Sequence, residues 1–514
     1  MIALKFAYLG QNYNGLEYAA GNATPQPTIE EALWAALNKG RLILPTDKQA
    51  MAAGQITWEG CDYTKCGRTD KGVSAFGQVV SLRVRSNRPL PGRRKMKRTP
   101  NGVKPNRETN HENMDEEAAD VDEVESPFHP IKDEIPYVHI INRLLPLDIR
   151  ILAWCSDLPE DFSARFSCRE RRYRYFFTNP AFTPTPKSTG ILASRTIDSR
   201  TGAARREGWL DIEAMQEAAK RYEGLHDFRN LSKLDATKQI TEFKRRIYRS
   251  EIVAVDSNSD SAGYVLSKAF SETTTQASTL NNNNHVSQAP KVYQFILHGS
   301  AFLWHQVRHM MAILLLIGQG LEHPDIINKL MDPQICPLRP QYQMADDAPL
   351  VLWDCIYSNP DSTDNEDALD WIYAGDEPGA DNREGKGKYG LSGLVDSLWT
   401  VWRQRKMDEI LAGSLLNLAV SQGRNEDIIT PARDRKTKLY LGGDSVMVKG
   451  SYIPLMQRPC CEHFEVANAK YAAKKGYTPK SAEELRELIA RKKRGDKRRD
   501  HVEDDYIESP SPTI

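Results

Sequence analysis

The chain has 514 residues, with 69 basic and 69 acidic side chains, so its formal net charge is zero. This length allows two or more domains around a large core, and the balanced charge excludes an argument for nucleic-acid binding from net charge alone. The eight cysteines include no Cys-x-x-Cys pair, and a chain of this size needs no disulfides, so we expect reduced thiols in an intracellular compartment. The longest apolar run, residues 310–317, is too short to span a bilayer, so we expect no membrane association.

The first predicted elements are a strand over residues 2–9 and a helix that ends before Gly40. Residues 1–9 alternate like a strand and carry Lys5, which is unlike a signal peptide. Thr28 and Glu31 have the spacing of a capping box, and apolar residues follow them at helical intervals. A helix therefore follows the first strand.

A glycine-rich polar loop, residues 66–77, comes next and leads into a predicted strand over residues 78–84. Its sequence is Cys-Gly-Arg-Thr-Asp-Lys-Gly-Val-Ser-Ala-Phe-Gly. Glycine permits positive φ and close approach of another chain. The spacing of Gly67 and Gly72 matches a phosphate-binding loop, but Val73 and Ser74 stand where Lys and Ser/Thr are required. A tight turn with a capping aspartate is the structural alternative.

Residues 86–134 lack hydrophobic periodicity and are predicted to form a disordered insertion. Ten basic and no acidic residues lie between Arg83 and Arg107, whereas eight acidic and no basic residues lie between Glu112 and Glu125. Such blocks of like charge favour solvated chain over a packed element.

Strands and helices alternate again after the insertion. We expect a helix over 136–145, a strand over 148–154, a strand over 172–177, a helix from Asp211 to Gly224, strands over 243–255 and 292–297, helices over 303–317 and 325–331, and a strand over 350–357. Residues 256–290 are rich in Ser, Thr and Asn and are predicted to be a low-complexity loop. This order favours an α+β fold with helices on one face of a mainly antiparallel sheet.

Two further patterns leave alternatives open. His305 and His309 are spaced like the histidines of a zinc protease, but Gln306 replaces the essential glutamate and no third ligand is evident. A metal-dependent hydrolase is therefore a weak competing hypothesis. Residues 358–514 contain an acidic loop, helices from Leu391 and basic runs near 491–499, which would suit phosphate binding, nuclear import or a solvated tail.

Several motifs, in order, resemble the TruA family of tRNA pseudouridine synthases. The sequence Gly-Arg-Thr-Asp-Lys-Gly-Val-Ser-Ala resembles the family signature, which implies that Asp70 is the catalytic carboxylate and Arg68 helps to displace the target base. The run from Phe162 to Tyr175 resembles the second motif, in which Tyr173 would pack on that base. The segment 301–309 resembles the third, in which Arg308 would pair with the catalytic aspartate. The remaining residues that we expect to bind substrate are Thr69, Lys71, Asp227, Phe228 and His305. Asp227 and Phe228 belong to the segment 224–230, which lines the cleft in the family.

The resemblance implies a function and a more detailed fold. The expected reaction converts uridine to pseudouridine in tRNA, with base flipping and without a cofactor or metal. Phe76, the run 162–168 and the segment 226–230 resemble the eukaryotic branch that modifies uridines 38 and 39 of the anticodon stem-loop. A catalytically silent tRNA-binding or folding protein, or action at another tRNA position, is the alternative.

The implied fold has two ferredoxin-like, RRM-like halves that share one long sheet, with the catalytic cleft between them. We expect an N-terminal catalytic half at 1–155, a C-terminal catalytic half at 156–357 and an extension at 358–514. The expected partner is tRNA, with no obligate protein partner, and the expected location is the nucleus and cytoplasm.

Overall fold

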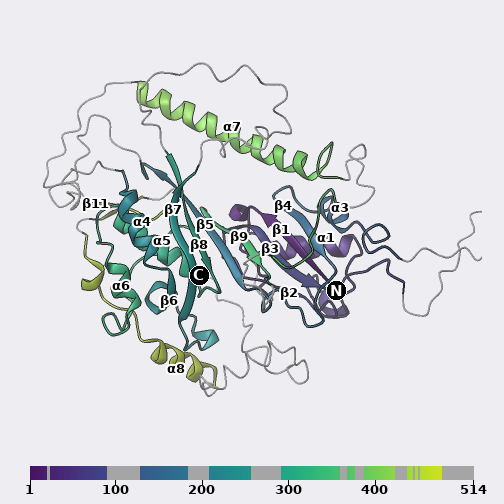
Figure 1. Cartoon of the computed structure of the whole chain (residues 1–514), viewed down its shortest axis with the longest axis horizontal. Helices are drawn as coiled ribbons and strands as arrows, with labels where there is room; N and C mark the ends of the chain where they lie inside the picture. The colour runs from purple at the N-terminus through teal and green to yellow at the C-terminus, as the bar shows by residue number, and fades with distance from the viewer. Residues whose placement is uncertain are drawn as a thin grey trace, which may run out of the picture.

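The computed structural model describes residues 1–19, 24–89, 128–182, 208–255, 291–358, 367–376, 387–422, 437–443, 446–449 and 452–476 (Figure 1). Most of the expected insertion, the loop 256–290 and the basic tail beyond 476 lie outside these residues. Within them, no helix has the length and apolar composition needed to cross a membrane.

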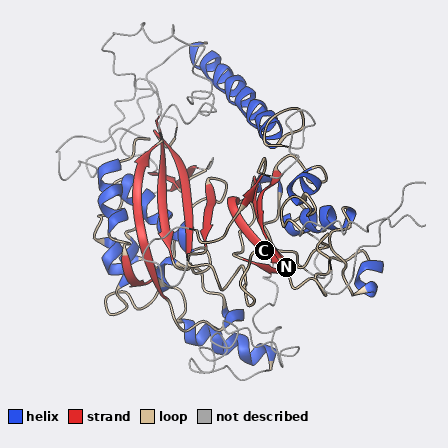
Figure 2. Cartoon of the chain, turned by 45° about the vertical axis from the view of Figure 1, so that its right-hand side comes forward, coloured by secondary structure: helices blue, strands red, loops and turns tan. Residues whose placement is uncertain are grey.

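A ten-stranded sheet runs through the middle of the molecule (Figures 1 and 2). Its strands are β1 (Ile2–Tyr8), β2 (Thr64–Lys65), β3 (Ser74–Leu82), β4 (Ile149–Cys155), β5 (Glu170–Asn179), β6 (Gly224–Asp227), β7 (Lys244–Ala254), β8 (Lys291–Gly299), β9 (Leu350–Ile356) and β10 (Ile372–Tyr373). Their order is β10-β4-β1-β3-β9-β5-β8-β7-β6, and β2 pairs with β3 beside this path. A separate two-stranded sheet pairs β11 (Thr437–Tyr440) with β12 (Val446–Lys449).

The central pair, β3 with β9, joins two groups of strands. It is parallel, with Ser74 opposite Val351 and Ala75 opposite Leu352, whereas every other pair in the large sheet is antiparallel. The glycine-rich loop leads directly into β3, so it lies where the two groups meet. The sheet is therefore mainly antiparallel, as expected.

Helices pack beside the sheet (Figure 2), and the buried apolar side chains form two hydrophobic cores. The helices are α1 (Ile29–Lys39), α2 (Lys48–Ala52), α3 (Tyr137–Asn142), α4 (Ile212–Lys220), α5 (Gln306–Gly318), α6 (Ile326–Met331), α7 (Leu394–Ser421) and α8 (Phe464–Lys475). One core lies between α1, α3 and the N-terminal strands, and the other surrounds α5, all thirteen residues of which are buried. The long helix α7 lies apart from the sheet at the top of Figure 1.

The expected α+β class is confirmed, and local signals located most elements to within a few residues. Thr28 accepts from the backbone N–H of Glu31 in the predicted capping box, and Asp211 caps α4 in the same manner. The first residues of two elements differ from the prediction. The strand β3 begins at Ser74 because the end of the loop pairs with β9, and α5 begins at Gln306 rather than near Leu303.

Candidate active site

The loop that carries Asp70 rests on the segment following β1. The hydroxyls of Tyr8 and Thr69 are 2.7 Å apart and hydrogen-bonded, and both side chains are buried. The backbone N–H of Leu16 donates to the carbonyl of Thr69. Gly15 has a φ of +84°, and a Cβ there would lie 2.7 Å from the same carbonyl oxygen. Thr69, which we expected to contact substrate, therefore anchors the loop from below.

Asp70 lies above this anchor, and its carboxylate meets two neighbouring side chains from the start of α5. The indole Nε1 of Trp304 lies 3.4 Å from Oδ1, and Nε2 of His305 lies 3.2 Å from Oδ2. The Asp70 side chain retains 30% of its exposure. The carboxylate is thus oriented by two ring nitrogens while one side stays open to a substrate.

His305 reaches Asp70 because it lies outside the helix rather than within it. Its φ is +58°, in the left-handed region that non-glycine residues rarely adopt, and it occupies the N-cap position of α5. Its Nδ1 is buried without a hydrogen-bond partner among the described residues. Such strain persists only where the surroundings hold it, and it is concentrated at functional sites.

The two histidines with the spacing of a zinc protease have different partners. His309 turns away from Asp70 and lies 3.3 Å from the guanidinium of Arg339, with its ring edge-on to Tyr342. Burial, reinforced by Arg339, holds the pKa of His309 well below its usual value. In the described part of the chain, neither His305 nor His309 belongs to a cluster of three possible metal ligands.

Arg308 differs from the prediction, because its ion pair is with Asp347 instead of Asp70. One Nη of Arg308 lies 3.5 Å from the Asp347 carboxylate, and its Nε donates to the carbonyl of Ala345 at 2.8 Å. Asp347 in turn lies against Gly72, where a Cβ would come within 2.7 Å of its carboxylate oxygen. Gly72 has a φ of +79°, so Arg308 supports the turn that follows Asp70.

Tyr173 lies where the two hydrophobic cores meet and packs against both. Its ring packs edge-on against the ring of Phe302, with 5.0 Å between the ring centres. The pairing of β5 with β9 shifts by one residue beside Tyr173, where Trp353 is the extra residue on β9, whereas β5 pairs with β8 without a shift. Burial raises the pKa of Tyr173, so its phenol is neutral near pH 7.

Comparison with known proteins identifies the family. A family model described as tRNA pseudouridine synthase matches residues 218–358. The chain is 35% identical to tRNA pseudouridine(38/39) synthase of Saccharomyces cerevisiae, over 92% of this chain and 78% of the relative. It is 34% identical to the Mus musculus protein of the same name, over 100% of this chain and 84% of the relative. It is 25% identical to tRNA pseudouridine synthase A of Dechloromonas aromatica, over 64% of this chain and 83% of the relative. The chain belongs to the tRNA pseudouridine synthase family.

Arg68, a predicted substrate contact of this synthase-family site, is held by a network of ion pairs that ends at Glu30 on α1. Its Nε lies 2.9 Å from Glu17, which also pairs with Lys65. Lys65 continues to the buried carboxylate of Glu30. These pairs orient the Arg68 side chain, while Lys71 is exposed beside Asp70. Their contact with substrate stays a prediction.

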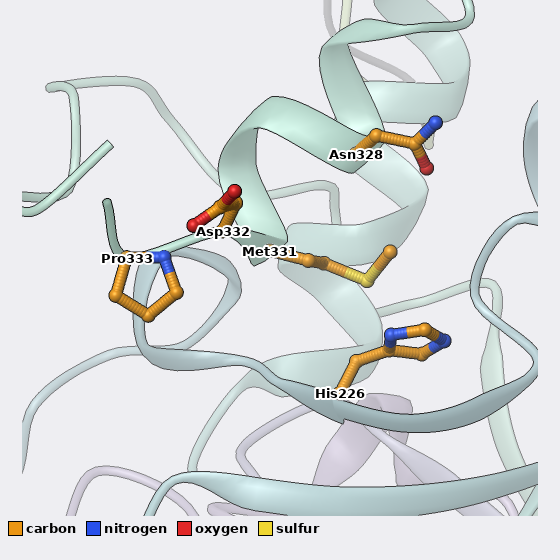
Figure 3. Close-up of a pocket in the computed structure, with 5 residues that line it drawn as sticks. All are labelled: His226, Asn328, Met331, Asp332 and Pro333. Atoms are coloured by element: carbon orange, nitrogen blue, oxygen red, sulfur yellow. The ribbon is translucent and has the colours of Figure 1, made fainter. Parts of the chain in front are cut away.

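The segment 224–230 contributes less to the site than the family resemblance implies. Asp227 pairs with Arg229 through both carboxylate oxygens. Phe228 is completely buried in the C-terminal core beside Tyr222, which differs from the expected position on the cleft surface. A pocket lies next to this segment, against α6, and none of the predicted catalytic side chains lines it (Figure 3).

Arg171 is a site-supporting residue that sequence analysis did not single out. One Nη donates to the carbonyls of Cys66 and Arg165, and the other donates to the carbonyl of Ser300. These bonds tie the start of the predicted catalytic loop, residues 66–77, to the strand that carries Tyr173. The sequence signal for Arg171 was its spacing from Tyr173, because residues two positions apart on a strand face the same side of the sheet.

Proposed function

We propose that this chain converts uridine to pseudouridine in tRNA, at uridines 38 and 39 of the anticodon stem-loop, with Asp70 as the catalytic residue. The observation that carries the proposal is the partly exposed Asp70 carboxylate, held by His305 and Trp304 where the two strand groups meet. Similarity over most of the chain to relatives named for positions 38 and 39 supports the choice of substrate.

The reaction breaks the bond between N1 and C1′, rotates the base and forms a bond between C5 and C1′. A proton leaves C5 and N1 gains one, so the product is an isomer and no electrons are supplied from outside. The central requirement is a carboxylate at the ribose, which either attacks C1′ or removes a ribose proton. Asp70 serves either route, because its open side faces solvent while its two ring contacts fix its orientation.

Tyr173 and Arg68 assist by holding the base. A flipped nucleotide loses its stacking partners at a cost of a few kcal/mol, and an aromatic ring in the pocket compensates part of this cost. The raised pKa of Tyr173 favours packing and hydrogen-bond donation over action as a phenolate base. Arg68, oriented by Glu17, then occupies the space that the target base leaves.

The same proposal includes the domain plan. Two separate cores and a single parallel strand pair between them support two ferredoxin-like halves, at 1–155 and 156–357, with the cleft at their junction. Residues 358–514 form an extension. We expect the protein in the nucleus and cytoplasm, which localisation of a fluorescent fusion tests.

The decisive experiment compares the parent protein with Asp70→Asn on the same tRNA preparation. The amide keeps the size and much of the hydrogen bonding of the carboxylate but is neither a comparable nucleophile nor a base. We expect tRNA affinity within about twofold of the parent, because phosphate contacts dominate RNA affinity, and no detectable pseudouridine. Asp62→Asn, at an exposed carboxylate on the surface loop before β2, is the matched control and keeps full turnover.

The position is tested with stem-loops in which cytidine replaces uridine 38, uridine 39 or both. Loss of product only in the double replacement supports the assignment, whereas modification elsewhere contradicts it. Near-parental turnover by Asp70→Asn would disprove the catalytic role. Tight tRNA binding without turnover by the parent protein would favour the silent tRNA-binding alternative.

A further inference from the structure

Three cysteines form a buried cluster directly below the catalytic loop. They are Cys66, which opens the loop, Cys168, which precedes β5, and Cys355 on β9. Their Sγ atoms all lie within 4.8 Å of one another, and the three residues are between 0% and 7% exposed. Segments far apart in the sequence therefore bring three thiols to one point at the start of the loop that carries Asp70.

The spacing of these sulfur atoms suits a thiolate-binding metal. Zn–S bonds of about 2.3 Å in a tetrahedron place sulfurs about 3.8 Å apart, so a small inward adjustment of the cluster closes the ligand set. Soft thiolate ligands select Zn²⁺ and similar ions over Mg²⁺ or Ca²⁺. Ordinary core packing of three thiols would produce similar distances, so a second observation is needed to choose between them.

The second observation is the charge of Arg171. Its side chain is partly buried, and the hydrogen bonds of its guanidinium all go to backbone carbonyls, those of Cys66, Arg165 and Ser300. No ion pair with a carboxylate is found for it among the described residues. A buried cation without an anionic partner is costly. Three thiolates with Zn²⁺ carry one net negative charge, which Arg171 neutralises.

We propose that Cys66, Cys168 and Cys355 bind one Zn²⁺ as a structural site that fixes the entry of the catalytic loop. The hydroxyl of Tyr357, which lies within hydrogen-bonding reach of Cys66, is the oxygen donor for the fourth position. Its hydroxyl proton goes to the carbonyl of Ala164 at 2.7 Å, so its lone pairs remain available. Binding releases the three thiol protons to solvent as three Zn–S bonds form, without any change in oxidation state.

The site is structural because the sulfurs are sealed from solvent, whereas Asp70 is partly exposed. The metal would join the loop to β9 and to the segment before β5, where Arg171 already makes bonds. Its loss should therefore loosen the position of Asp70 and lower thermal stability. The proposal is independent of which uridine the protein modifies.

The test begins with the full-length protein purified under reducing conditions without added metal. We expect one zinc per chain by elemental analysis. After exchange with Co²⁺, we expect sulfur-to-cobalt charge-transfer absorption and the intense visible bands of tetrahedral cobalt. Removal of the metal should lower Tm, and Zn²⁺ alone should restore it.

Variants locate the metal. Cys66→Ser, Cys168→Ser and Cys355→Ser should each lose the cobalt spectrum, whereas Cys336→Ser, at an equally buried thiol outside the cluster, should keep it. A Cys460→Ser, Cys461→Ser double variant should also keep it. Loss of the spectrum only in this double variant would overturn the proposal. So would the absence of zinc, of a cobalt-thiolate spectrum and of any zinc effect on Tm in the parent protein, a result that needs no variant to fold.

Discussion

At the residue scale, the site depends on side chains that aim one carboxylate. Asp70 meets His305 and Trp304 on one side, while Arg308 acts on the following turn through Asp347. The direct contacts and the indirect support come from the two ends of the same short segment, 304–308. Changes at Arg308 should therefore alter the placement of Asp70 rather than the capture of tRNA.

Arg308→Lys keeps the charge but loses the planar fork that contacts Ala345 and Asp347 together. We expect kcat to fall about 10–100-fold, the size expected for a small misplacement of a catalytic group, with tRNA Kd within about twofold. Asp347→Asn should produce a similar loss, and the double variant should be less than additive. Arg221→Lys, at a partly exposed arginine paired with Glu217, is the control. A parallel loss of affinity and rate would identify Arg308 as a phosphate contact.

His309 makes the free energy of unfolding depend on pH, and the direction of the effect follows from its pKa. Its pKa is depressed in the folded state by burial and Arg339, whereas the unfolded chain has the ordinary value of about 6.5. Below about pH 6.5 the unfolded state binds a proton that the folded state refuses, so the free energy of unfolding falls as pH decreases.

The size of this contribution follows from the linkage. Between pH 7.5 and 5.5, His309 should contribute up to about 1.4 kcal/mol of lost stability. Urea denaturation of the parent and His309→Gln at both pH values measures the difference. Equal pH dependence in the parent and His309→Gln would show that His309 is not the group responsible.

At the element scale, the contact between β3 and β9 determines how closely the two strand groups approach. A Cβ on Gly77 would lie 2.5 Å from the Asp354 carboxylate and 2.7 Å from its Cα. A Cβ on Gly67 would meet nothing nearer than a nitrogen of Arg171 at 3.9 Å. Glycine is therefore required at Gly77 for close approach, but not at Gly67.

This pair provides a matched test of the junction. Gly77→Ala should destabilise the protein by about 1–3 kcal/mol, the usual cost of overpacking, and should reduce turnover because the catalytic loop leads into the same strand. Gly67→Ala should change stability by less than about 0.5 kcal/mol. Denaturant unfolding measures both. If Gly77→Ala is as stable as the parent, the strand junction is looser than the structure indicates.

At the scale of the whole molecule, the ends of the expected insertion are close together. The backbone N–H of Asn87 donates to the Glu134 carboxylate at 2.9 Å, and its side chain donates to the carbonyl of Asp133. The guanidinium of Arg88 lies 5.9 Å from the ring centre of Phe128. A short linker would therefore be long enough to join residue 89 to residue 128.

Replacing residues 90–127 with a short Gly/Ser linker should leave the sheet intact. We expect the free energy of unfolding to change by less than about 1 kcal/mol, because loop length affects closure entropy only slowly. Turnover on tRNA should persist, with weaker binding at high salt if the basic block contacts phosphates. A scrambled segment of the same length and composition separates charge from sequence. Failure of the linker variant to fold would mean that the segment contains a structural element.

Local chemistry along the sequence was sufficient for the class of fold, the main strands and helices and the catalytic loop. Caps such as Thr28 with Glu31 involve residues three positions apart, so they are visible in a short window. The resemblance of the loop and the later motifs to one family identified Asp70, Tyr173 and Arg308 as candidates. Their roles as catalytic groups are predictions that the variants above test.

Only the tertiary structure decided which side chains meet. Asp70 and Trp304 are 234 positions apart, and no periodicity connects residues so distant. The same holds for the Asp347 partner of Arg308, for the three clustered cysteines and for the burial of Phe228. His305 shows the physical reason at its clearest. A helical pattern predicted it inside a helix, but it lies at the cap with a φ of +58° and contacts Asp70, so tertiary contacts outweighed local preference.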